Sequence, residues 1–413
     1  MEPPLEVARR MKIAGRARKR RRLLLAVVAS VVAVPPGDVS ACVRRKRLDW
    51  NVHKQTLLLE AELTRCYRME VDSFKKLLLL VRPALLRDAV QSERRTGSDP
   101  ITPENMLQMT ISWLAGSSYH TTRGLGGMSR SEIYDVIHVV MYALCECEEL
   151  HIRSPTESRV RVQELADDFA SISKDNILTG CVGCLDGWLC EIRAPSTEEV
   201  PDVSAFFSGH YQMYGLNAQA ICDSLCRFTG YCFDSPGKVG DSIAFKKWKL
   251  SDEILALPSG FYCVADNAYP LTDSLLVPYN KLEIKSKKHS DLNFYLSQLR
   301  IRIEMAFGLL VNKWQIFKKA LVVDFKNVGK VIKTGMKIHN YCINERIIND
   351  ATTTMHTTVS TAYHSLPESS YQPTDSRDLG VQTSLASDAQ GRILRQVIGD
   401  HIHNFNLRRP HVR

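Results

Sequence analysis

The sequence of 413 residues predicts an α/β protein, in which a domain built on a mixed sheet follows a small all-helical domain. Three observations support this fold class. Short runs rich in apolar and β-forming residues, separated by Pro and Gly, begin near residue 178 and are typical of strands. Several of these runs end in an acid, and a long apolar helix with an acid at its centre follows them. The region before residue 150 shows helical periodicity instead.

This pattern divides the chain into five segments. A basic tail precedes the helical domain, which has a helix-turn-helix-like outline, and a linker joins that domain to the α/β domain. The final segment is rich in Ser and Thr and poor in large apolar residues, so we expect it to be disordered apart from a short helix near residues 390–401. The expected bounds of the five segments are 1–47, 48–150, 151–175, 176–346 and 347–413.

The excess positive charge is confined to the basic tail. Residues 1–47 hold 13 Lys and Arg against three acids, a net charge of +10, whereas the remainder has a net charge of −1. The clusters at 16–22 and 44–47 are typical of a nuclear-localisation signal or a nucleic-acid arm, which predicts a nuclear protein, and a solvated tail is the alternative. Residues 23–34 look like the apolar part of a secretory signal, so secretion is a third interpretation. Twelve residues cannot span a bilayer as a helix, and we expect no membrane contact.

The helical domain is expected to contain two helices on either side of a short segment at 117–128. Pro103 suits a first helical position, Gly116 ends the first helix, and Ser129 or Ser131 caps the second. This outline is that of a helix-turn-helix, which would place the second helix in a DNA groove. A plain helical packing domain is the alternative, because Arg130 is the one obvious base-reading side chain on that helix.

The expected helix at 293–317 is apolar on nearly all sides, yet Glu304 lies in its middle. A buried carboxylate needs a partner, because an unpaired charge away from water is unfavourable. One partner is Arg300, a turn earlier, although an acid that follows its base is the weaker order along a helix. The other is a divalent cation shared with acids from elsewhere, which predicts carboxylates at the ends of strands.

Asp186 and Asp266 are the acids that suit this second interpretation. Asp186 follows the apolar run CVGCL and Asp266 ends the run FYCVA, so we expect both at the C-terminal tips of buried strands. Three converging acids can hold two divalent ions that activate a water or a 3′-hydroxyl in phosphoryl transfer. Hard oxygen ligands favour Mg²⁺ or Mn²⁺. Taken singly, each Asp is also explained as an ordinary turn residue.

Five sequence blocks in this region occur in the order of a known family. They are GCLDG, GHYQMYGLNAQAICD, SPGKVGDSIAF, ADNAYPL and RIEMAFG. Together they resemble the PIF/Harbinger transposases and the nucleases derived from them, which belong to the DDE endonuclease superfamily. The resemblance covers about residues 176–346 and implies an RNase H-like fold with Asp186, Asp266 and Glu304 as the metal-binding catalytic triad. Asp241 is expected to be a supporting acid, and a turn acid that bonds its own backbone is the alternative.

The resemblance also implies a function. Two Mg²⁺ or Mn²⁺ ions held by the triad would activate water to cleave DNA, and in an active transposase the freed 3′-hydroxyl would then attack target DNA. Family members commonly work with a separate Myb-like DNA-binding partner, and self-association is left open. Trp188 and Leu189 stand where many relatives have a small polar residue and a histidine, and Asn267 replaces a small residue. The alternative from another class is a DNA-binding or scaffold protein that has lost catalysis.

Basic side chains near the proposed site are expected to contact DNA phosphates. Arg300 and Arg302 flank Glu304 in sequence and suit bidentate contacts to a scissile phosphate. Lys330, Lys333 and Lys337 recur on one helical face and predict a phosphate track, with a solvated outer face as the other interpretation.

The 12 cysteines show neither a disulfide pattern nor a zinc spacing. Cys181 and Cys184 form a CxxC without a second pair, inside an apolar strand-like run. We therefore expect buried free thiols.

Overall fold

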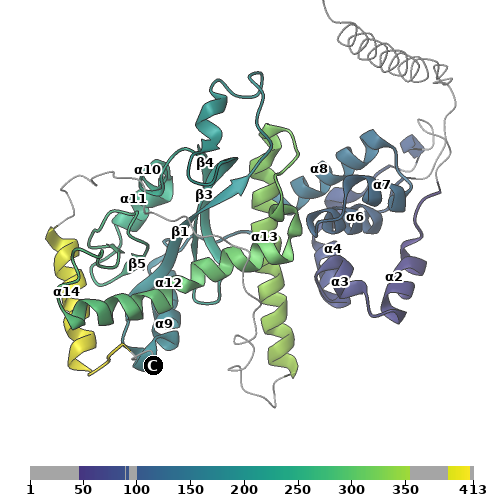
Figure 1. Cartoon of the computed structure of the whole chain (residues 1–413). Coiled ribbons are helices and arrows are strands. Elements are labelled where there is room, and N and C mark those ends of the chain that lie inside the picture. Colours follow the sequence, from purple (N-terminus) through teal and green to yellow (C-terminus); the bar gives the residue numbers. More distant parts are fainter. Residues whose placement is uncertain (1–45, 89, 93–99, 354–388, 410–413) are drawn as a thin grey trace, which may run out of the picture. The chain divides into compact units, whose positions relative to one another are not determined.

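The computed structural model describes residues 46–88, 90–92, 100–353 and 389–409 (Figure 1). Within them lies a six-stranded sheet with the path β2-β3-β1-β5-β6, and β4 also pairs with β3. Strand β1 is antiparallel to β3 and parallel to β5, which in turn is parallel to β6. The predicted mixed α/β class is therefore confirmed. The strands are β1 (Cys181–Glu191), β2 (Phe207–Ser208), β3 (Met213–Cys222), β4 (Phe228–Pro236), β5 (Tyr262–Val264) and β6 (Leu275–Leu276).

Strand β1 lies at the centre of the sheet and is buried along nearly all of its length. The sequence predicts a strand that ends at Asp186, but in the structure this strand continues to Glu191. Gly187 stays in the ladder and pairs with Gln219 of β3, so the strand continues past the predicted end. Asp186 consequently lies in the middle of β1, and its prediction as a strand tip is wrong. Asp266 does follow the end of β5, by two residues.

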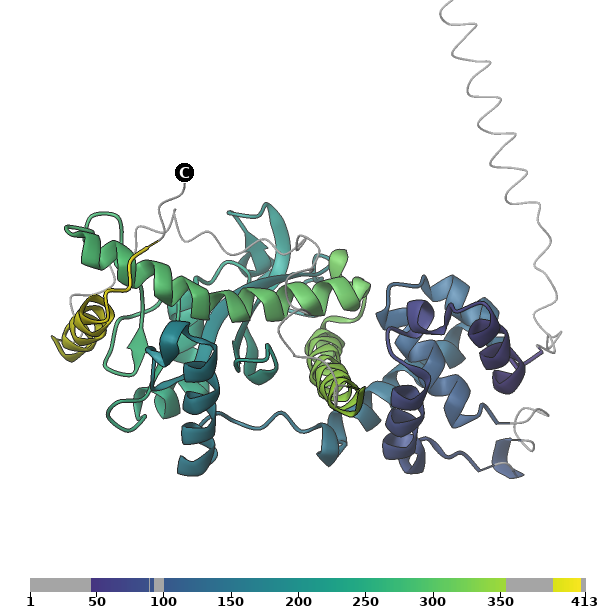
Figure 2. The ribbon, with the colours of Figure 1, turned by 90° about the horizontal axis from the view of Figure 1, so that it is seen from below.

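Long helix α12 (Lys287–Lys313) crosses one face of the sheet (Figure 2). Its apolar residues Leu292, Leu296, Leu299 and Ile303 recur at helical spacing and are buried, as the periodicity predicts. The Cys184 thiol donates a hydrogen bond to the Leu299 carbonyl at 3.1 Å. These contacts fix α12 on the face of β1 to which Cys184 points.

Helix α10 (Asp241–Lys247) lies on the opposite face of β1 and is followed by α11 (Lys249–Leu255). Side chains alternate between the faces of a strand, so Gly187 faces away from α12 when Cys184 and Asp186 face toward it. A Cβ atom on Gly187 would lie 2.1 Å from Oδ1 of Asp241. The start of α10 thus packs directly on the backbone of β1.

The segment predicted as a linker, 151–175, contains helix α9 (Arg159–Ile172). Ser158 caps its first turn by accepting a hydrogen bond from the backbone N–H of Arg161 at 3.1 Å. Val162, Leu165, Ala166 and Phe169 are buried at helical spacing, and α9 packs against β1. This correction has a simple cause, because an apolar stripe of this kind is stabilised only when it packs against another element.

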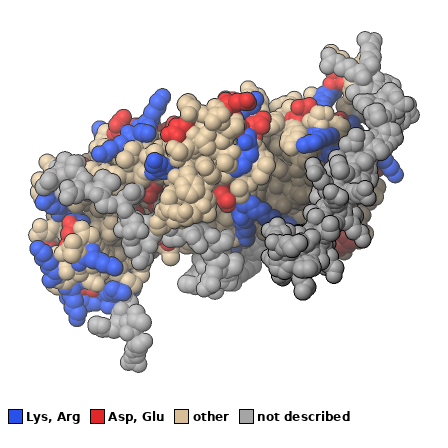
Figure 3. Space-filling model, turned by 45° about the horizontal axis from the view of Figure 1, so that its top comes forward, with Lys and Arg blue, Asp and Glu red and all other residues tan. Residues whose placement is uncertain are grey.

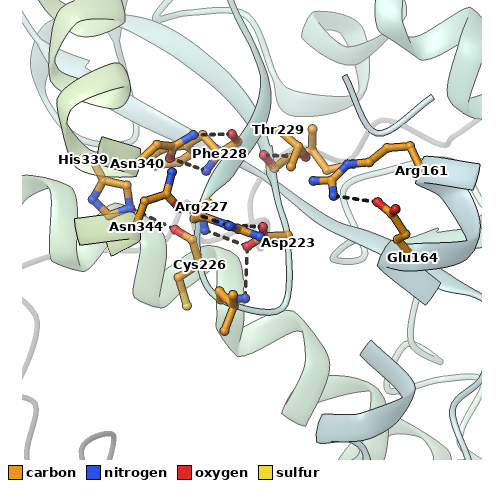
Figure 4. A network of polar contacts seen from close by, with 12 residues as sticks. Arg161, Glu164, Asp223, Cys226, Arg227, Phe228, Thr229, His339, Asn340 and Asn344 are labelled. Atoms are coloured by element: carbon orange, nitrogen blue, oxygen red, sulfur yellow. Dashed lines mark hydrogen bonds and ion pairs between the residues drawn. The ribbon is translucent and has the colours of Figure 1, made fainter. Parts of the chain in front are cut away.

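The turn between β3 and β4 is held on helix α13 (Phe325–Thr353), as Figure 4 shows. Asn340 donates to the carbonyl of Phe228 at 2.7 Å and accepts from its N–H at 2.8 Å, which closes the end of the ladder. His339 bonds the Cys226 carbonyl through Nε2 at 2.9 Å. Inside the turn, buried Asp223 pairs with Arg227 at 2.6 Å. The hairpin and α13 are therefore one packed unit.

The helical region before the sheet is formed by α2 (Trp50–Leu59), α3 (Leu63–Tyr67), α4 (Val71–Leu85), α6 (Pro103–Leu114), α7 (Tyr119–Gly126) and α8 (Arg130–Glu146). Pro103 is the first residue of α6, and Ser129 caps α8 in a capping box with Glu132. The segment expected to be a short connection is itself helix α7. The helix-turn-helix function of this region stays a prediction.

Helix α13 also packs against the helical region, and this contact corrects the predicted phosphate track. Lys337 is buried, and its Nζ atom donates to the carbonyl oxygens of Cys145 at 2.5 Å and Cys147 at 3.4 Å. These carbonyls lie at the C-terminal end of α8, where a cation is favourable. Because Lys337 is buried in these bonds, it cannot belong to an exposed row of phosphate contacts. Of the predicted track Lys330, Lys333 and Lys337, at least Lys337 therefore serves helix packing.

The C-terminal segment is predicted as disordered from residue 347, but the structure continues α13 to Thr353 and places α14 (Ala389–Asn404) against α12. Buried Arg395 of α14 pairs with Glu283 at 3.1 Å and lies over the Tyr279 ring, 3.9 Å from its centroid. The predicted short helix near 390–401 therefore exists. Residues 354–388, which carry most of the Ser/Thr-rich run, lie outside the described residues.

The basic tail and the apolar run at 23–34 also lie outside the described residues. Among the helices that are described, none combines the length and apolarity needed to cross a bilayer. The 11 cysteines in the described part of the chain are free, and most of them are buried, as expected.

Candidate active site

The parallel pairing of β1 with β5 brings two of the predicted acids together. Cys184 of β1 is level with Val264 of β5 in this register. Asp186 and Asp266 each lie two residues further along their chains, so the same register continued past the end of β5 places them side by side. The Asp266 carboxylate is oriented by its own turn, because its Oδ1 atom accepts a hydrogen bond from the N–H of Ala268 at 2.8 Å.

Helix α12 supplies the third predicted acid on the same face of β1. The Trp188 and Phe307 rings pack with their centroids 5.7 Å apart, which sets α12 against β1 on either side of Asp186. Arg300 Nη1 lies 3.8 Å from Oδ2 of Asp186 and also forms an ion pair with Oε1 of Glu304. One guanidinium nitrogen therefore contacts two of the acids. The salt bridge considered from the sequence is present, and it forms inside the cluster of acids.

The acids affect one another electrostatically. Burial raises the pKa of Asp186 well above its usual range, and the charges of Asp266 and Asp241 raise it further, while Arg300 opposes them. Burial likewise raises the pKa of Asp266 to about 6, with the Ala268 N–H and Arg300 opposing and Asp241 and Glu304 adding to the rise. Burial alone lowers the pKa of Arg300, but the charges of Glu304, Asp186 and Asp266 raise it, and the guanidinium stays charged. Such mutual perturbation is typical of functional clusters.

Asp241 approaches the cluster from the other face of β1. Its Oδ1 atom accepts hydrogen bonds from the side-chain amides of Asn217 and Gln219, each at 2.9 Å. Gln219 in turn accepts a hydrogen bond from the Tyr269 hydroxyl at 2.6 Å. The alternative of a turn acid bonded to its own backbone does not describe these contacts, which go to side chains of β3.

Asn217, Gln219 and Tyr269 are the residues that sequence reasoning missed. A signal for two of them is present in the run GLNAQAIC, where polar amides occupy alternate positions of an otherwise apolar strand. Alternation places both amides on one face, and buried amides are retained where they find hydrogen-bond partners. No comparable signal marks Tyr269, whose buried hydroxyl finds its partner on β3.

Arg302 does not join the cluster. Residues two apart on a helix point in nearly opposite directions, so Arg300 and Arg302 cannot both face Asp186. The Arg302 side chain hydrogen-bonds the buried Cys226 thiol at the β3–β4 turn instead. The prediction that Arg302 binds the scissile phosphate is therefore not supported by its position, whereas Arg300 does lie at the cluster.

The chemistry of the cluster suits divalent metal ions, although its side chains are not arranged around a metal position in this structure. As the side chains stand, no group of three or more His, Cys, Asp or Glu residues in the described ranges is placed to hold a metal ion. The donors are nevertheless the hard carboxylate oxygens that Mg²⁺ and Mn²⁺ prefer. Cations held by these carboxylates would offset both the burial and the repulsion from Asp266 and Asp241 that raise the pKa of Asp186. We conclude that the residues suit such ions.

Comparison with known proteins finds a similarity that covers this site. Residues 185–340 match the family model described as DDE superfamily endonuclease. The match covers less than half of the chain, but it contains Asp186, Asp241, Asp266 and Glu304. No curated protein and no solved structure matches the chain. The similarity supports the superfamily inferred from the sequence blocks.

Proposed function

We propose that the chain is a divalent-metal-dependent DNA endonuclease of the PIF/Harbinger transposase type. Asp186, Asp266 and Glu304 would hold two Mg²⁺ or Mn²⁺ ions. The observation that carries this proposal is the convergence of a central-strand acid, an acid after the adjacent parallel strand and a helix acid around a single guanidinium. The family match over residues 185–340 and the mixed sheet agree with the RNase H-like fold that the sequence blocks imply.

Each residue of the cluster has a defined part in the proposed reaction. The bound ions would supply the activated water and neutralise charge on the phosphodiester. Asp186 is fixed by the β1–β3 ladder, in which it pairs with Ala220, and Asp266 is fixed by the bond from Ala268, so these two acids are preorganised. Glu304 is held one helical turn from Arg300 on α12. Once the acids bind cations, Arg300 would be released to bind the scissile phosphate.

DNA is the proposed substrate because of the chemistry of the site and the distribution of basic side chains. Figure 3 shows Lys and Arg spread over the visible face, most densely at its left end. Lys246, Lys247 and Lys249 near α10, and Lys281, Lys285 and Lys287 before and at the start of α12, are exposed or partly exposed residues that can contact phosphates. A Myb-like partner and self-association are parts of the same proposal.

Nuclear localisation is also proposed, from the +10 charge of residues 1–47. Fusing these residues to a fluorescent protein tests it directly. Accumulation of the fusion in the nucleus would support the proposal, whereas entry into the secretory pathway would favour the signal-like run at 23–34.

The decisive experiment measures nicking of a supercoiled plasmid by the purified chain with Mn²⁺ or Mg²⁺. Replacing Asp266 by Ala should abolish nicking and leave plasmid binding largely unchanged, because a metal ligand is lost while the basic surface remains. Asp273→Ala is the matched control, since this exposed Asp lies seven residues further on and outside the cluster. Nicking that survives Asp266→Ala would refute the assignment.

An inactive DNA-binding or scaffold protein is the second candidate function. The observation that favours it is the pairing of Arg300 with Glu304 and Asp186, which neutralises part of the cluster without any metal. In that case the wild-type chain should bind the plasmid but never nick it with either ion. Nicking by wild type that depends on Asp266 excludes this candidate.

A further inference from the structure

A network of buried polar side chains behind the proposed site links strand β3, the start of helix α10 and the turn that follows β5. The Tyr269 hydroxyl donates to Oε1 of Gln219 at 2.6 Å, and Nε2 of Gln219 donates to Oδ1 of Asp241 at 2.9 Å. Asn217 completes it by donating to Oδ1 of Asp241 at 2.9 Å and to the Val239 carbonyl at 2.8 Å. The donors and acceptors are complementary throughout, because the tyrosine turns the Gln219 amide so that its NH₂ group faces the carboxylate.

This network of hydrogen bonds passes over the central strand β1 at Gly187, the residue after Asp186. Gln219 is on β3 and Tyr269 follows β5, and β1 lies between these two strands. Gly187 of β1 is directly opposite Gln219 in the ladder. A Cβ atom there would lie 2.1 Å from Oδ1 of Asp241 and 2.7 Å from Nε2 of Gln219. The crossing therefore requires glycine next to the first acid.

The same contacts determine where the second acid lies. Asp266 and Tyr269 belong to one tight turn, closed by a bond from the Tyr269 N–H to the Asp266 carbonyl at 3.3 Å. The Tyr269 ring is buried and packs edge-on against Phe245 of α10, with centroids 5.8 Å apart. Strand β5 ends at Val264, and the Ala265 N–H still donates to the Leu276 carbonyl of β6 at 3.1 Å, so the sheet holds the backbone up to the residue before Asp266. Beyond that residue, the Tyr269 hydroxyl ties the turn to Gln219 of β3.

We propose that Tyr269, Gln219, Asn217 and Asp241 form a positioning network that fixes the Asp266 turn relative to Asp186, and that Gly187 is the residue that gives it room. The inference rests on the proposed function and deepens it. None of the four residues needs to touch substrate or metal, so all act through the placement of Asp266. Comparable outer contacts around metal-binding carboxylates contribute about 10- to 100-fold to metal affinity or activity.

The test compares two buried tyrosines of the same segment. Tyr269→Phe removes the hydroxyl of the network, whereas Tyr262→Phe removes a buried hydroxyl that has no hydrogen-bond partner in the described part of the chain. Mn²⁺ affinity is measured on the full chain by electron paramagnetic resonance of free Mn²⁺, and kcat and KM by plasmid nicking. Tyr269→Phe should raise the Mn²⁺ dissociation constant and lower kcat by about tenfold or more with an unchanged KM. Tyr262→Phe should change neither.

Gln219→Met supplies an independent break of the network with similar side-chain volume, and it should reproduce the effect of Tyr269→Phe. If wild type binds Mn²⁺ and nicks DNA, and both network variants match it in affinity and kcat, the positioning role is refuted while the proposed function stands. If wild type neither binds Mn²⁺ nor nicks DNA, the proposed function is refuted, and this inference is refuted with it because it rests on that function. A lower melting temperature with unchanged kcat would indicate a merely structural role and also refute the inference.

Discussion

Replacing Asp266 by Asn should stabilise the metal-free protein at the cost of its proposed chemistry. The pKa of the Asp266 carboxyl rises from an ordinary 3.8 to about 6, first because it is buried and further because Asp241 and Glu304 are near. At about 1.4 kcal/mol per unit, ionisation of this group at pH 8 disfavours the folded state by on the order of 3 kcal/mol. Asn keeps the shape and can still accept the bond from Ala268, but it carries no charge.

The sign of the pH dependence follows from the raised pKa. Between about pH 4 and pH 6 the folded protein holds a proton on Asp266 that the unfolded chain has lost, so the wild type loses stability as pH rises through this window. The variant lacks this loss. Its advantage should therefore be small below about pH 4 and reach its full value above about pH 7.

Urea denaturation with a chelator present measures this difference, and Trp188 is a suitable reporter because it is buried beside the cluster against α12. Asp273→Asn controls for the chemical change at an exposed site. The reasoning is refuted if Asp266→Asn is less stable than wild type at pH 8, or if its advantage does not shrink on acidification. The same variant should have lost metal-dependent nicking.

Two further perturbations separate the roles of buried cations. Arg300→Gln should destabilise the metal-free chain by about 2 kcal/mol at pH 8, because Glu304 and Asp186 lose a charged hydrogen-bond partner. The loss should vanish at low pH, where acids are protonated. Urea denaturation at both pH values measures it, and a variant as stable as wild type at pH 8 would contradict the prediction. Lys337→Met should lower stability by about 2 kcal/mol, because the bonds to the carbonyl oxygens of Cys145 and Cys147 are lost. It should leave the affinity for DNA unchanged, as measured by fluorescence anisotropy. Weaker DNA binding with unchanged stability would restore the phosphate-track interpretation.

Much of the site could be predicted because it depends on local patterns. An acid beside glycine in an apolar run, an acid ending a second run and an acid within an apolar helix are all visible in the chain itself. The exact place of Asp186 could not be predicted, because glycine usually interrupts strands, and here the pairing of Gly187 with Gln219 continues one.

The periodicities of the helices and strands, a serine cap at the start of α8 and the three candidate acids could be predicted from the chain, since they depend on residues a few positions apart; the structure then selected Ser129 over Ser131 as the cap. Tertiary structure alone decided which charged side chains share a site. It turned Arg302 toward Cys226, buried Lys337 against the end of α8 and joined Asp241 to Tyr269 through Gln219. Partners of this kind come from elements far apart in the chain, and the distance between them is set by packing and strand register, which no local pattern encodes.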